Sequence, residues 1–586
     1  MAGSGSFSEV FEMKKSAFLS LFLVLILLLC ACGQAATAPG AAPGTAGEAV
    51  PQPAAEPEAQ APAETQAEAA PETLAPEEPS GEYVVSDVDL SRAADTADNA
   101  RVFYEIFVGS FSDSNGDGIG DLRGILNRFD YLNDGDLASG KSLGVEGLWL
   151  TPIFDSPSYH KYNVTDYYAI DPDFGTMEDL KELADLCESR NVKLILDLPI
   201  NHTGSRNAWF SAFVNAHRNA DPQDPYYDFY CWYGPGESAP AGRHYAPVSG
   251  TSDYYECNFD NSMPELNFDN ELVRQTVLDV ARFYLDLGVD GFRFDAAKYV
   301  YYGDNESSAD FWNWYMAELR AIDPEIYVVA EVWDGDGITD KYYPAMNCFN
   351  FTMAMSGGLI DETAKAGSVG RYASYVENYL SAVQALRPDA MIVPFVANHD
   401  NDRASGFLPS SNGQMQMAAN LYLLGPGSPF IYYGEEIGMR GSRGSANTDA
   451  NRRLAMRWGD GDTVQDPEGS TYPDQSEVDL SQQLPRPGSL YTYYKRLLMI
   501  RRANPEIARG SYTAVSVPDS KVGGFVSVWQ GSAVCVLHNT SMGQKTIDLA
   551  ALGLDFEELS AVVGLGEAVL DGTKLILGGQ TSVVLR

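Results

Sequence analysis

Residues 271–298 read ELVRQTVLDVARFYLDLGVDGFRFDAAK, and they carry the clearest signal of the fold. In residues 271–287 apolar side chains recur at helical spacing, which predicts an amphipathic helix. Residues 291–294 form a short apolar run, typical of a buried strand, that leads directly into polar residues. An amphipathic helix followed by a buried strand is the repeating unit of a parallel α/β fold.

The same unit recurs from about residue 100 onward. Further apolar runs predict strands at residues 102–108, 147–152, 193–200, 327–332, 347–351, 392–397 and 429–433. Between them, residues 177–190 and 310–322 have helical periodicity, and a helix at 490–502 would close the ring. Eight strands alternating with helices predict a (β/α)8 TIM barrel, an α/β fold.

Two segments do not fit the barrel repeat. Residues 204–270, after the third strand, are rich in Tyr, Trp, Pro and Gly, and a link this long is normally functional. We expect an inserted domain there, between barrel segments 96–203 and 271–505. Short alternating runs after residue 506 predict a C-terminal antiparallel β-sandwich domain at 506–586.

The amino terminus predicts export. Basic Lys14 and Lys15 precede an apolar run at residues 17–29, which is too short to span a membrane and typical of a signal peptide. The run ends in Leu-Cys-Ala-Cys, which resembles a bacterial lipobox with Cys32 as the lipidated residue. Residues 1–32 are therefore interpreted as a signal peptide, and the protein as lipid-anchored on the bacterial cell surface. An ordinary secretory signal is the alternative.

Residues 33–95 are rich in Ala, Pro and Glu, and we expect a disordered stalk there. The net charge of −42 argues against a nucleic-acid partner. The cysteines beyond Cys32 lack metal-ligand spacing. Cys231 and Cys257 are either a disulfide or free thiols. We expect a monomer.

Polar side chains follow four of the predicted strands. The residues at these strand ends are Asp197, Asn201, His202, Arg293, Asp295, Lys298, Glu331, His399 and Asp400. Because the carboxyl ends of barrel strands meet on one rim, we expect these side chains to converge. Paired carboxylates suit glycoside hydrolysis, in which one attacks the sugar and a protonated one delivers a proton to the leaving oxygen.

The four segments resemble the signature regions of family 13 glycoside hydrolases, the α-amylase family, in the same order. The resemblance extends from about residue 100 to the end of the chain. It implies retaining, endo-acting hydrolysis of α-1,4-glucosidic bonds in starch, maltodextrin and related α-glucans. By this resemblance Asp295 is the nucleophile, Glu331 the general acid/base and Asp400 the residue that stabilises the transition state.

The resemblance also implies a set of sugar-binding residues. They are His160, Tyr162, His202, Arg293, Lys298, His399, Asp449 and Arg453. Tyr162 would stack on the sugar, and Asp449 and Arg453 would hold the next glucose along. The segment Met263-Pro-Glu-Leu-Asn267 is similar to that of members intermediate between the neopullulanase and oligo-1,6-glucosidase groups.

Several activities share these catalytic residues. Ala296-Ala297-Lys298 after the expected nucleophile is similar to amylases, whereas exo-acting relatives often carry Val or Thr and no Lys. Oligo-1,6-glucosidase, α-glucosidase, neopullulanase and transglycosylase activity remain alternatives. A non-catalytic glycan-binding barrel is disfavoured, because Asp295 and Glu331 are both present.

Residues 113–121 read DSNGDGIGD and have the oxygen-ligand spacing of a calcium loop. The candidate ligands are Asp113, Asn115, Asp117, Ile119 and Asp121. The loop resembles the metal loop after the first strand in oligo-1,6-glucosidase-like members; a metal-free turn is the alternative. A second calcium site, which in many amylases uses a His after the Lys298 position, is not expected because Tyr299 stands there.

Overall fold

The computed structural model describes residues 84–85, 88–93, 98–136, 138–409, 413–473 and 478–586. The predicted signal peptide, the lipobox Cys32 and the predicted stalk up to residue 83 lie outside these residues. Within the described ranges, no helix is both long and apolar enough to cross a membrane.

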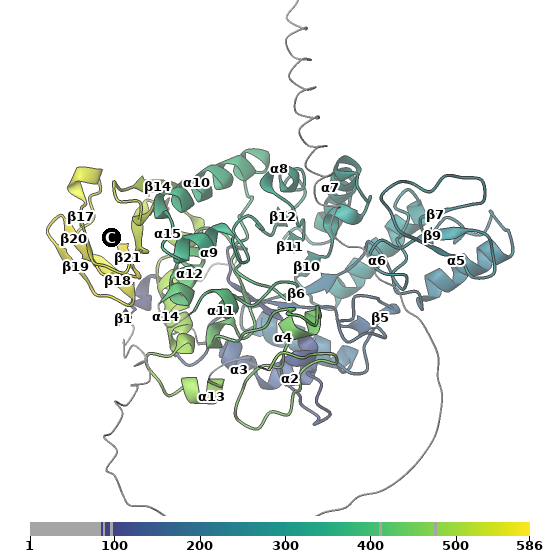
Figure 1. Cartoon of the computed structure of the whole chain (residues 1–586), viewed down its shortest axis with the longest axis horizontal. Helices are drawn as coiled ribbons and strands as arrows, with labels where there is room; N and C mark the ends of the chain where they lie inside the picture. Colours follow the sequence, from purple (N-terminus) through teal and green to yellow (C-terminus); the bar gives the residue numbers. More distant parts are fainter. Residues whose placement is uncertain (1–83, 86–87, 94–97, 137, 410–412, 474–477) are drawn as a thin grey trace, which may run out of the picture. The chain divides into compact units, whose positions relative to one another are not determined.

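A curved parallel sheet forms the centre of the catalytic region (Figure 1). Its strand order is β12-β11-β10-β6-β3-β2-β13, and every neighbouring pair is parallel. The strands are β2 (Phe103–Ile106), β3 (Gly147–Leu150), β6 (Lys193–Leu198), β10 (Gly291–Phe294), β11 (Tyr327–Ala330), β12 (Asn347–Cys348) and β13 (Phe430–Tyr432). Seven of the eight predicted strands are therefore regular strands.

The remaining predicted strand, at residues 392–397, closes the ring without regular strand pairing. Val393 makes an isolated parallel bridge to Phe349, beside β12. On the other side the Phe430 N–H of β13 donates to the Pro394 carbonyl at 3.0 Å. Pro394 has no N–H to donate, so a continuous ladder cannot form here. The (β/α)8 barrel is confirmed, and isolated backbone hydrogen bonds connect this segment to its two neighbours.

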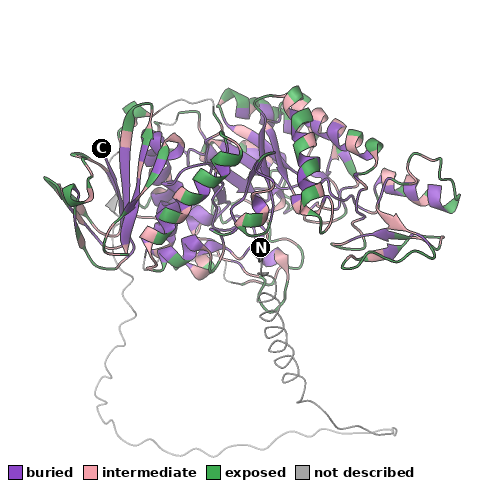
Figure 2. Ribbon diagram, turned by 90° about the horizontal axis from the view of Figure 1, so that it is seen from above, coloured by how far each residue is buried: buried purple, intermediate pink, exposed green. Residues whose placement is uncertain are grey.

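Helices cover the outside of the sheet. These helices include α4 (Met177–Ser189), α6 (Glu271–Asp286), α7 (Asn305–Ile322), α10 (Val369–Leu386), α12 (Gln414–Leu423) and α14 (Leu490–Ala503). Their starts follow from local sequence: Thr176 and Asp179 form a capping box on α4, and the Asn270 side chain caps α6. In Figure 2 the strands of the central sheet are buried, whereas the helices around it expose their outer faces.

Aromatic side chains fill the barrel interior. Phe103 stacks on Phe430 with ring centroids 4.8 Å apart, and Trp149 packs edge-on against the same ring at 5.9 Å. Gly147 on β3 makes room for this core, because a Cβ there would lie 2.4 Å from the Phe103 ring. A packed interior leaves chemistry to the strand ends.

The segment after β6 contains a small antiparallel sheet of its own. It comprises α5 (Ala208–Arg218), β7 (Trp232–Tyr233), β8 (Tyr245–Pro247) and β9 (Tyr254–Glu256). The disulfide alternative for Cys231 and Cys257 is not formed: both are free thiols. The Glu256 N–H donates to the Cys231 carbonyl, so Cys231 lies across from Glu256 and not from Cys257. Successive side chains of a strand point to opposite faces, which separates the two thiols.

The C-terminal residues form two antiparallel sheets, as predicted. The first has the order β1-β18-β21-β16-β15-β14 and the second β17-β20-β19. The strands are β1 (Val84–Val85), β14 (Ser511–Ser516), β15 (Val522–Trp529), β16 (Ser532–Asn539), β17 (Lys545–Asp548), β18 (Leu559–Gly564), β19 (Ala568–Asp571), β20 (Lys574–Leu577) and β21 (Thr581–Leu585). Apolar side chains of both sheets, among them Leu537 and Leu575, share one core. Pairing of β1 with β18 shows that regular structure begins before residue 96, inside the range expected to be stalk.

Two consecutive buried carboxyls lie just beyond β13. Glu435 accepts hydrogen bonds from the Tyr422 and Tyr494 hydroxyls at 2.6 and 2.9 Å. Glu436 accepts from Tyr104 at 2.8 Å and from Tyr131. The second carboxyl oxygen of each glutamate has no hydrogen-bond partner in the described residues. Burial raises the pKa of Glu435 to about 7.

Glu435→Gln should make the thermal stability less dependent on pH. The carboxyl's pKa rises from its ordinary 4.5 to about 7 in the folded protein, so the folded state holds a proton that the unfolded chain releases earlier. Its stabilising contribution is complete below pH 4.5 and is lost as pH rises through about 7. Because a difference of one pH unit between the two pKa values corresponds to about 1.4 kcal/mol, the free energy of unfolding should fall by roughly 3 kcal/mol over this range.

Calorimetric melting temperatures between pH 4 and pH 8 would test this expectation. The unmodified protein should lose several degrees more than the Gln variant across that range. Glu567→Gln, at an exposed position, is the matched control and should follow the unmodified protein. Parallel curves for all three proteins would contradict the prediction.

Candidate active site

The Arg293 guanidinium joins three carboxylates at the carboxyl ends of neighbouring strands. Arg293 on β10 lies in register with Asp197 on β6, and its Nη1 donates to that carboxylate at 2.8 Å. The same Nη1 donates to Asp295 at 2.7 Å, and Nη2 lies 3.2 Å from Glu331 Oε2. The Arg293 side chain is fully buried. The predicted nucleophile and the predicted acid are therefore both within reach of one cation.

The environment of Glu331 favours its protonated form. Burial raises the Glu331 pKa to about 7; the Arg293 charge opposes the rise, and the charges of Asp295 and Asp400 add to it. Its Oε2 also accepts the Ala296 N–H at 3.0 Å. Ala296 has the left-handed φ of 46°, which costs a non-glycine residue roughly 1–2 kcal/mol. A carboxyl with a pKa near neutrality is suited to donate a proton.

His399 is held as an imidazolium between carboxylates. Burial alone would lower its pKa, but the Asp400 charge and the Glu105 contact raise it to about 10. Nδ1 donates to Glu105 Oε1 at 2.6 Å, and Nε2 lies 2.7 Å from the Tyr162 hydroxyl. Tyr162 in turn donates to Asp197 at 2.8 Å. This chain of bonds connects His399 to the carboxylates around Arg293.

Asp400 is held in its charged form. Although burial opposes ionisation, the charges of His399 and Arg453 hold the Asp400 pKa well below its usual range. Arg453 Nη2 donates to Asp400 at 2.7 Å and Nη1 to the Tyr159 hydroxyl at 3.0 Å. Asp400 and Glu331 therefore have opposite protonation tendencies in one site.

Asp449 lies beside this pair and is itself bound by two arginines. Arg443 donates to both of its oxygens at 2.6 Å, and Arg452 donates at 2.9 Å. Burial would raise the Asp449 pKa, but the Arg443 hydrogen bonds and the charge of Arg453 lower it below its usual value.

The other two predicted histidines are neutral. Burial lowers the pKa of His160 to about 4, and its Nδ1 accepts the Tyr162 N–H at 3.2 Å. Burial also lowers the pKa of His202, whose Nε2 lies 3.1 Å from the Tyr162 carbonyl oxygen. Nδ1 of His202 is buried with no partner in the described residues. The predicted sugar-binding residue Lys298 donates to the Trp333 carbonyl at 2.8 Å and to Asp334 at 3.1 Å, both in the loop after β11.

These residues surround a cavity of about 770 Å³. Of the predicted site residues, the cavity is lined by His160, Tyr162, His202, Asp295, Glu331, Asp400, Asp449 and Arg453. Arg293, Lys298 and His399 do not line it. Arg293 and His399 contact the lining residues directly, and Lys298 is bound to the loop after β11.

Sequence reasoning missed several members of the site. The cavity lining also includes Tyr159, Phe259, Asp260, Met263, Ala296, Tyr299, Trp333, Asn447 and Thr448. Trp333 is 41% exposed and Phe259 47%, which is unusual for large aromatic side chains and suits the C–H faces of sugars. Glu105, the partner of His399, had a signal in the sequence: it is the one charged residue in the apolar strand β2.

In the 113–121 loop, side-chain oxygens accept hydrogen bonds from the loop's own backbone N–H groups. Asp113 Oδ1 accepts the N–H groups of Asn115 and Gly116, and Asp117 accepts that of Ile119 at 2.8 Å. Asp121 differs, since its Oδ1 caps α2 (Leu122–Asn127) through the Gly124 N–H at 2.6 Å.

The side chains of Asp113, Asn115 and Asp117 and the carbonyl of Ile119 are hard oxygen donors, which fit calcium. Both oxygens of Asp121, like both oxygens of Asp113, already accept hydrogen bonds. In the described residues, no three His, Cys, Asp or Glu side chains gather into a metal cluster.

A barrel with two carboxylates joined by one arginine at its strand ends fits a glycoside hydrolase. The family model described as "Alpha amylase, catalytic domain" matches residues 105–510. The chain belongs to the alpha-amylase family, and the protein is a glycoside hydrolase of the amylase type.

Three relatives show the range of this similarity. Alpha-amylase 3 of Dictyoglomus thermophilum is 33% identical over 489 residues, which cover 83% of this chain and 93% of the relative. Oligo-1,6-glucosidase of Bacillus cereus is 28% identical, covering 76% and 91%. The solved structure of Eubacterium rectale Amy13B is 32% identical with a TM-score of 0.78, covering 84% and 96%. The two sequence relatives carry the names of different activities.

Proposed function

We propose that the protein is a retaining, endo-acting hydrolase of α-1,4-glucosidic bonds in starch, maltodextrin and related α-glucans. The observation that carries the proposal is the shared contact of Arg293 with Asp295 and Glu331, at 2.7 and 3.2 Å. One guanidinium can reach two carboxylates only when they are close together. Retaining enzymes place them about 5 Å apart, whereas inverting enzymes leave room for a water between them.

In the first step Asp295 attacks the anomeric carbon while Glu331 gives its proton to the leaving glycosidic oxygen. The C–O bond to the leaving chain breaks as the bond to Asp295 forms. In the second step Glu331, now ionised, takes a proton from water, and the resulting hydroxyl attacks the same carbon and releases Asp295. The charged Asp400 and the neutral His160 and His202 supply acceptors and donors for sugar hydroxyls.

The size of the cavity supports action within a chain. At about 770 Å³ it is larger than one glucose unit needs, and its lining includes many residues besides the carboxylates. Trp333 and Phe259 offer exposed aromatic faces in this lining, and Asp449 and Arg453 provide charged groups. The cavity therefore has room for several sugar units.

The product profile on amylose, pullulan and isomaltose tests the bond and the mode of attack. Rapid loss of iodine staining with mixed maltooligosaccharides is the expected result. Panose from pullulan would indicate neopullulanase-like breadth. Glucose from isomaltose with amylose untouched would contradict the proposal and favour oligo-1,6-glucosidase activity.

Asp295→Asn should lower kcat by about a thousandfold or more, because the amide cannot form the glycosyl ester. Affinity for a maltooligosaccharide, measured by calorimetry, should remain. Asp185→Asn on the exposed face of α4 is the matched control and should be fully active. Activity of Asp295→Asn within tenfold of the unmodified enzyme would overturn its assignment as nucleophile.

We also propose that the 113–121 loop binds calcium as a structural ion. A chelator should then lower the melting temperature by several degrees, because an ion that binds only the folded state stabilises it. The double variant Asp113→Asn/Asp117→Asn should melt lower and show no chelator effect, whereas Asp310→Asn should behave as the unmodified protein. An unchanged melting temperature in chelator would contradict the site.

Lipid anchoring through Cys32 is proposed from the sequence. Cys32→Ser, expressed with its leader, should move the protein from the membrane fraction to the soluble fraction, because the thioether-forming thiol is gone. Cys30→Ser, two residues earlier, is the matched control and should remain membrane-bound. Membrane retention of Cys32→Ser would contradict anchoring at this residue.

A further inference from the structure

A second cavity, of about 440 Å³, lies at the opposite ends of the barrel strands from the catalytic cavity. It is lined by Tyr327 at the start of β11 and Asn347 at the start of β12, whereas Glu331 follows the other end of β11. Gln384 of α10 and Trp529 of β15 complete its walls. We call it the basal groove; the catalytic mechanism uses none of these four residues.

We propose that the basal groove is a second, non-catalytic binding site for a segment of the α-glucan chain. The proposal rests on the proposed function for the nature of the polymer. Three features carry it: an aromatic wall, a balanced set of charges and uncharged polar side chains without partners.

Trp529 forms the aromatic wall. It is the last residue of β15 and pairs with Ser532 across a two-residue turn. Gln530 and Gly531 in that turn have φ values of 49° and 83°, typical of a tight hairpin, so the turn fixes the position of Trp529. In the described residues no aromatic ring stacks on Trp529. An indole without a ring partner can pack against the C–H face of a sugar.

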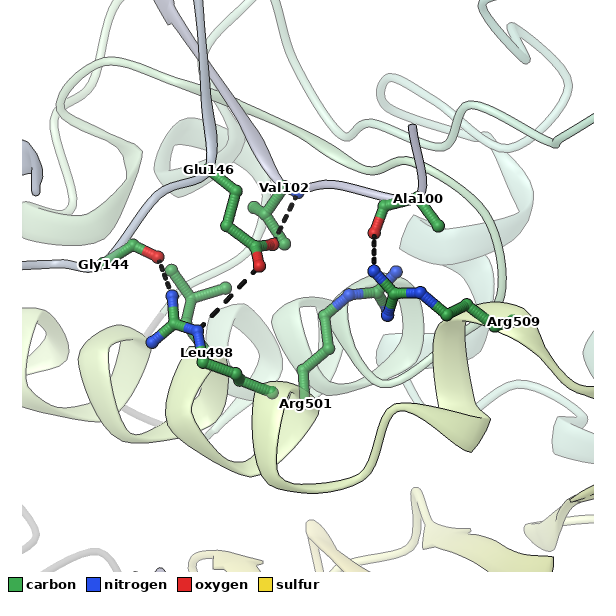
Figure 3. A pocket seen from close by; sticks show the side chains of 8 residues that line it. Ala100, Val102, Gly144, Glu146, Leu498, Arg501 and Arg509 are labelled. Atoms are coloured by element: carbon green, nitrogen blue, oxygen red, sulfur yellow. Dashed lines mark hydrogen bonds and ion pairs between the residues drawn. The ribbon is translucent and has the colours of Figure 1, made fainter. Parts of the chain in front are cut away.

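The charges of the groove balance each other. Its lining contains three arginines and three acidic residues: Arg320, Arg387, Arg509, Asp98, Glu325 and Asp389. Arg509 donates to Asp98 at 2.6 Å and to the Ala100 carbonyl at 3.3 Å, the latter drawn in Figure 3. Arg387 donates to Asp389 at 3.1 Å. A balanced lining on a chain of net charge −42 favours a neutral ligand over an ion.

Uncharged polar groups remain available for such a ligand. The side-chain amides of Asn99 and Gln384 and the Trp529 indole N–H have no hydrogen-bond partner in the described part of the chain. Amides both donate and accept, which matches the hydroxyls of a sugar. A neutral, polyhydroxylated ligand with apolar ring faces satisfies all three features.

The location of the groove allows it to bind the polymer while the catalytic cavity cleaves another part of it. A chain held at the base cannot compete for the catalytic cavity, because the two cavities open at opposite strand ends. For a polymer, a second contact on the same protein raises the effective concentration of substrate. The benefit is therefore confined to long or insoluble α-glucan.

The test compares Trp529→Ala with the unmodified enzyme on insoluble starch and on a short soluble maltooligosaccharide. Binding to and hydrolysis of insoluble starch should fall by about threefold to tenfold. The kcat/KM on the short substrate should not change. Gln384→Ala should give a smaller loss, and Val528→Ala, the neighbouring exposed residue of β15, is the matched control and should give none.

Equal starch binding by Trp529→Ala and the unmodified enzyme would overturn the inference. So would a parallel loss on the short substrate, which would indicate a general structural role. Release from starch by inorganic phosphate at constant ionic strength would identify an anion site instead. An unmodified enzyme that neither cleaves nor binds α-glucan would overturn the proposed function itself, a result distinct from failure of the groove alone.

Discussion

The buried Arg293 guanidinium is the constraint on which the catalytic site depends. Burying a cation is strongly unfavourable unless nearby anions offset the loss of hydration. Here the anions come from neighbouring strands: Asp197 within β6, Asp295 after β10 and Glu331 after β11. Strand register brings these carboxylates together, and without the cation they would repel one another. The position of the catalytic carboxylates therefore depends on both the strand register of the barrel and the buried guanidinium.

From this cation a chain of hydrogen bonds sets the charge of the rest of the site. Tyr162 joins Asp197 to His399, and Glu105 holds the far nitrogen of that imidazole. The imidazolium lowers the pKa of Asp400, whereas burial raises that of Glu331. Two carboxyls in one cavity therefore take different protonation states, as acid catalysis beside a charged stabiliser requires.

Hydrogen bonds connect the 113–121 loop with the long loop after β13. Thr463 donates to Asp113 at 2.7 Å, and Ser112 donates to Asp462 at 2.6 Å, so the 113–121 loop is fastened to the long loop after β13. That loop also carries Asp449 and Arg453. An ion in the 113–121 loop would stabilise the segment that holds these cavity residues, although it lies outside the catalytic cavity.

The sequence alone determined the strand–helix alternation, the antiparallel C-terminal sheets and the residues at the strand ends, because these depend on local periodicity and order along the chain. It did not predict that residues 392–397 close the ring without regular strand pairing. The partners of this segment, Phe349 and Phe430, lie on strands far from each other in the sequence. The contact of Glu105 with His399 joins residues far apart in the sequence. Strand register separates Cys231 from Cys257, and the basal groove lies where Trp529 and Gln384 of α10 line one cavity. These features depend on contacts between segments far apart in sequence, which only the tertiary structure decided.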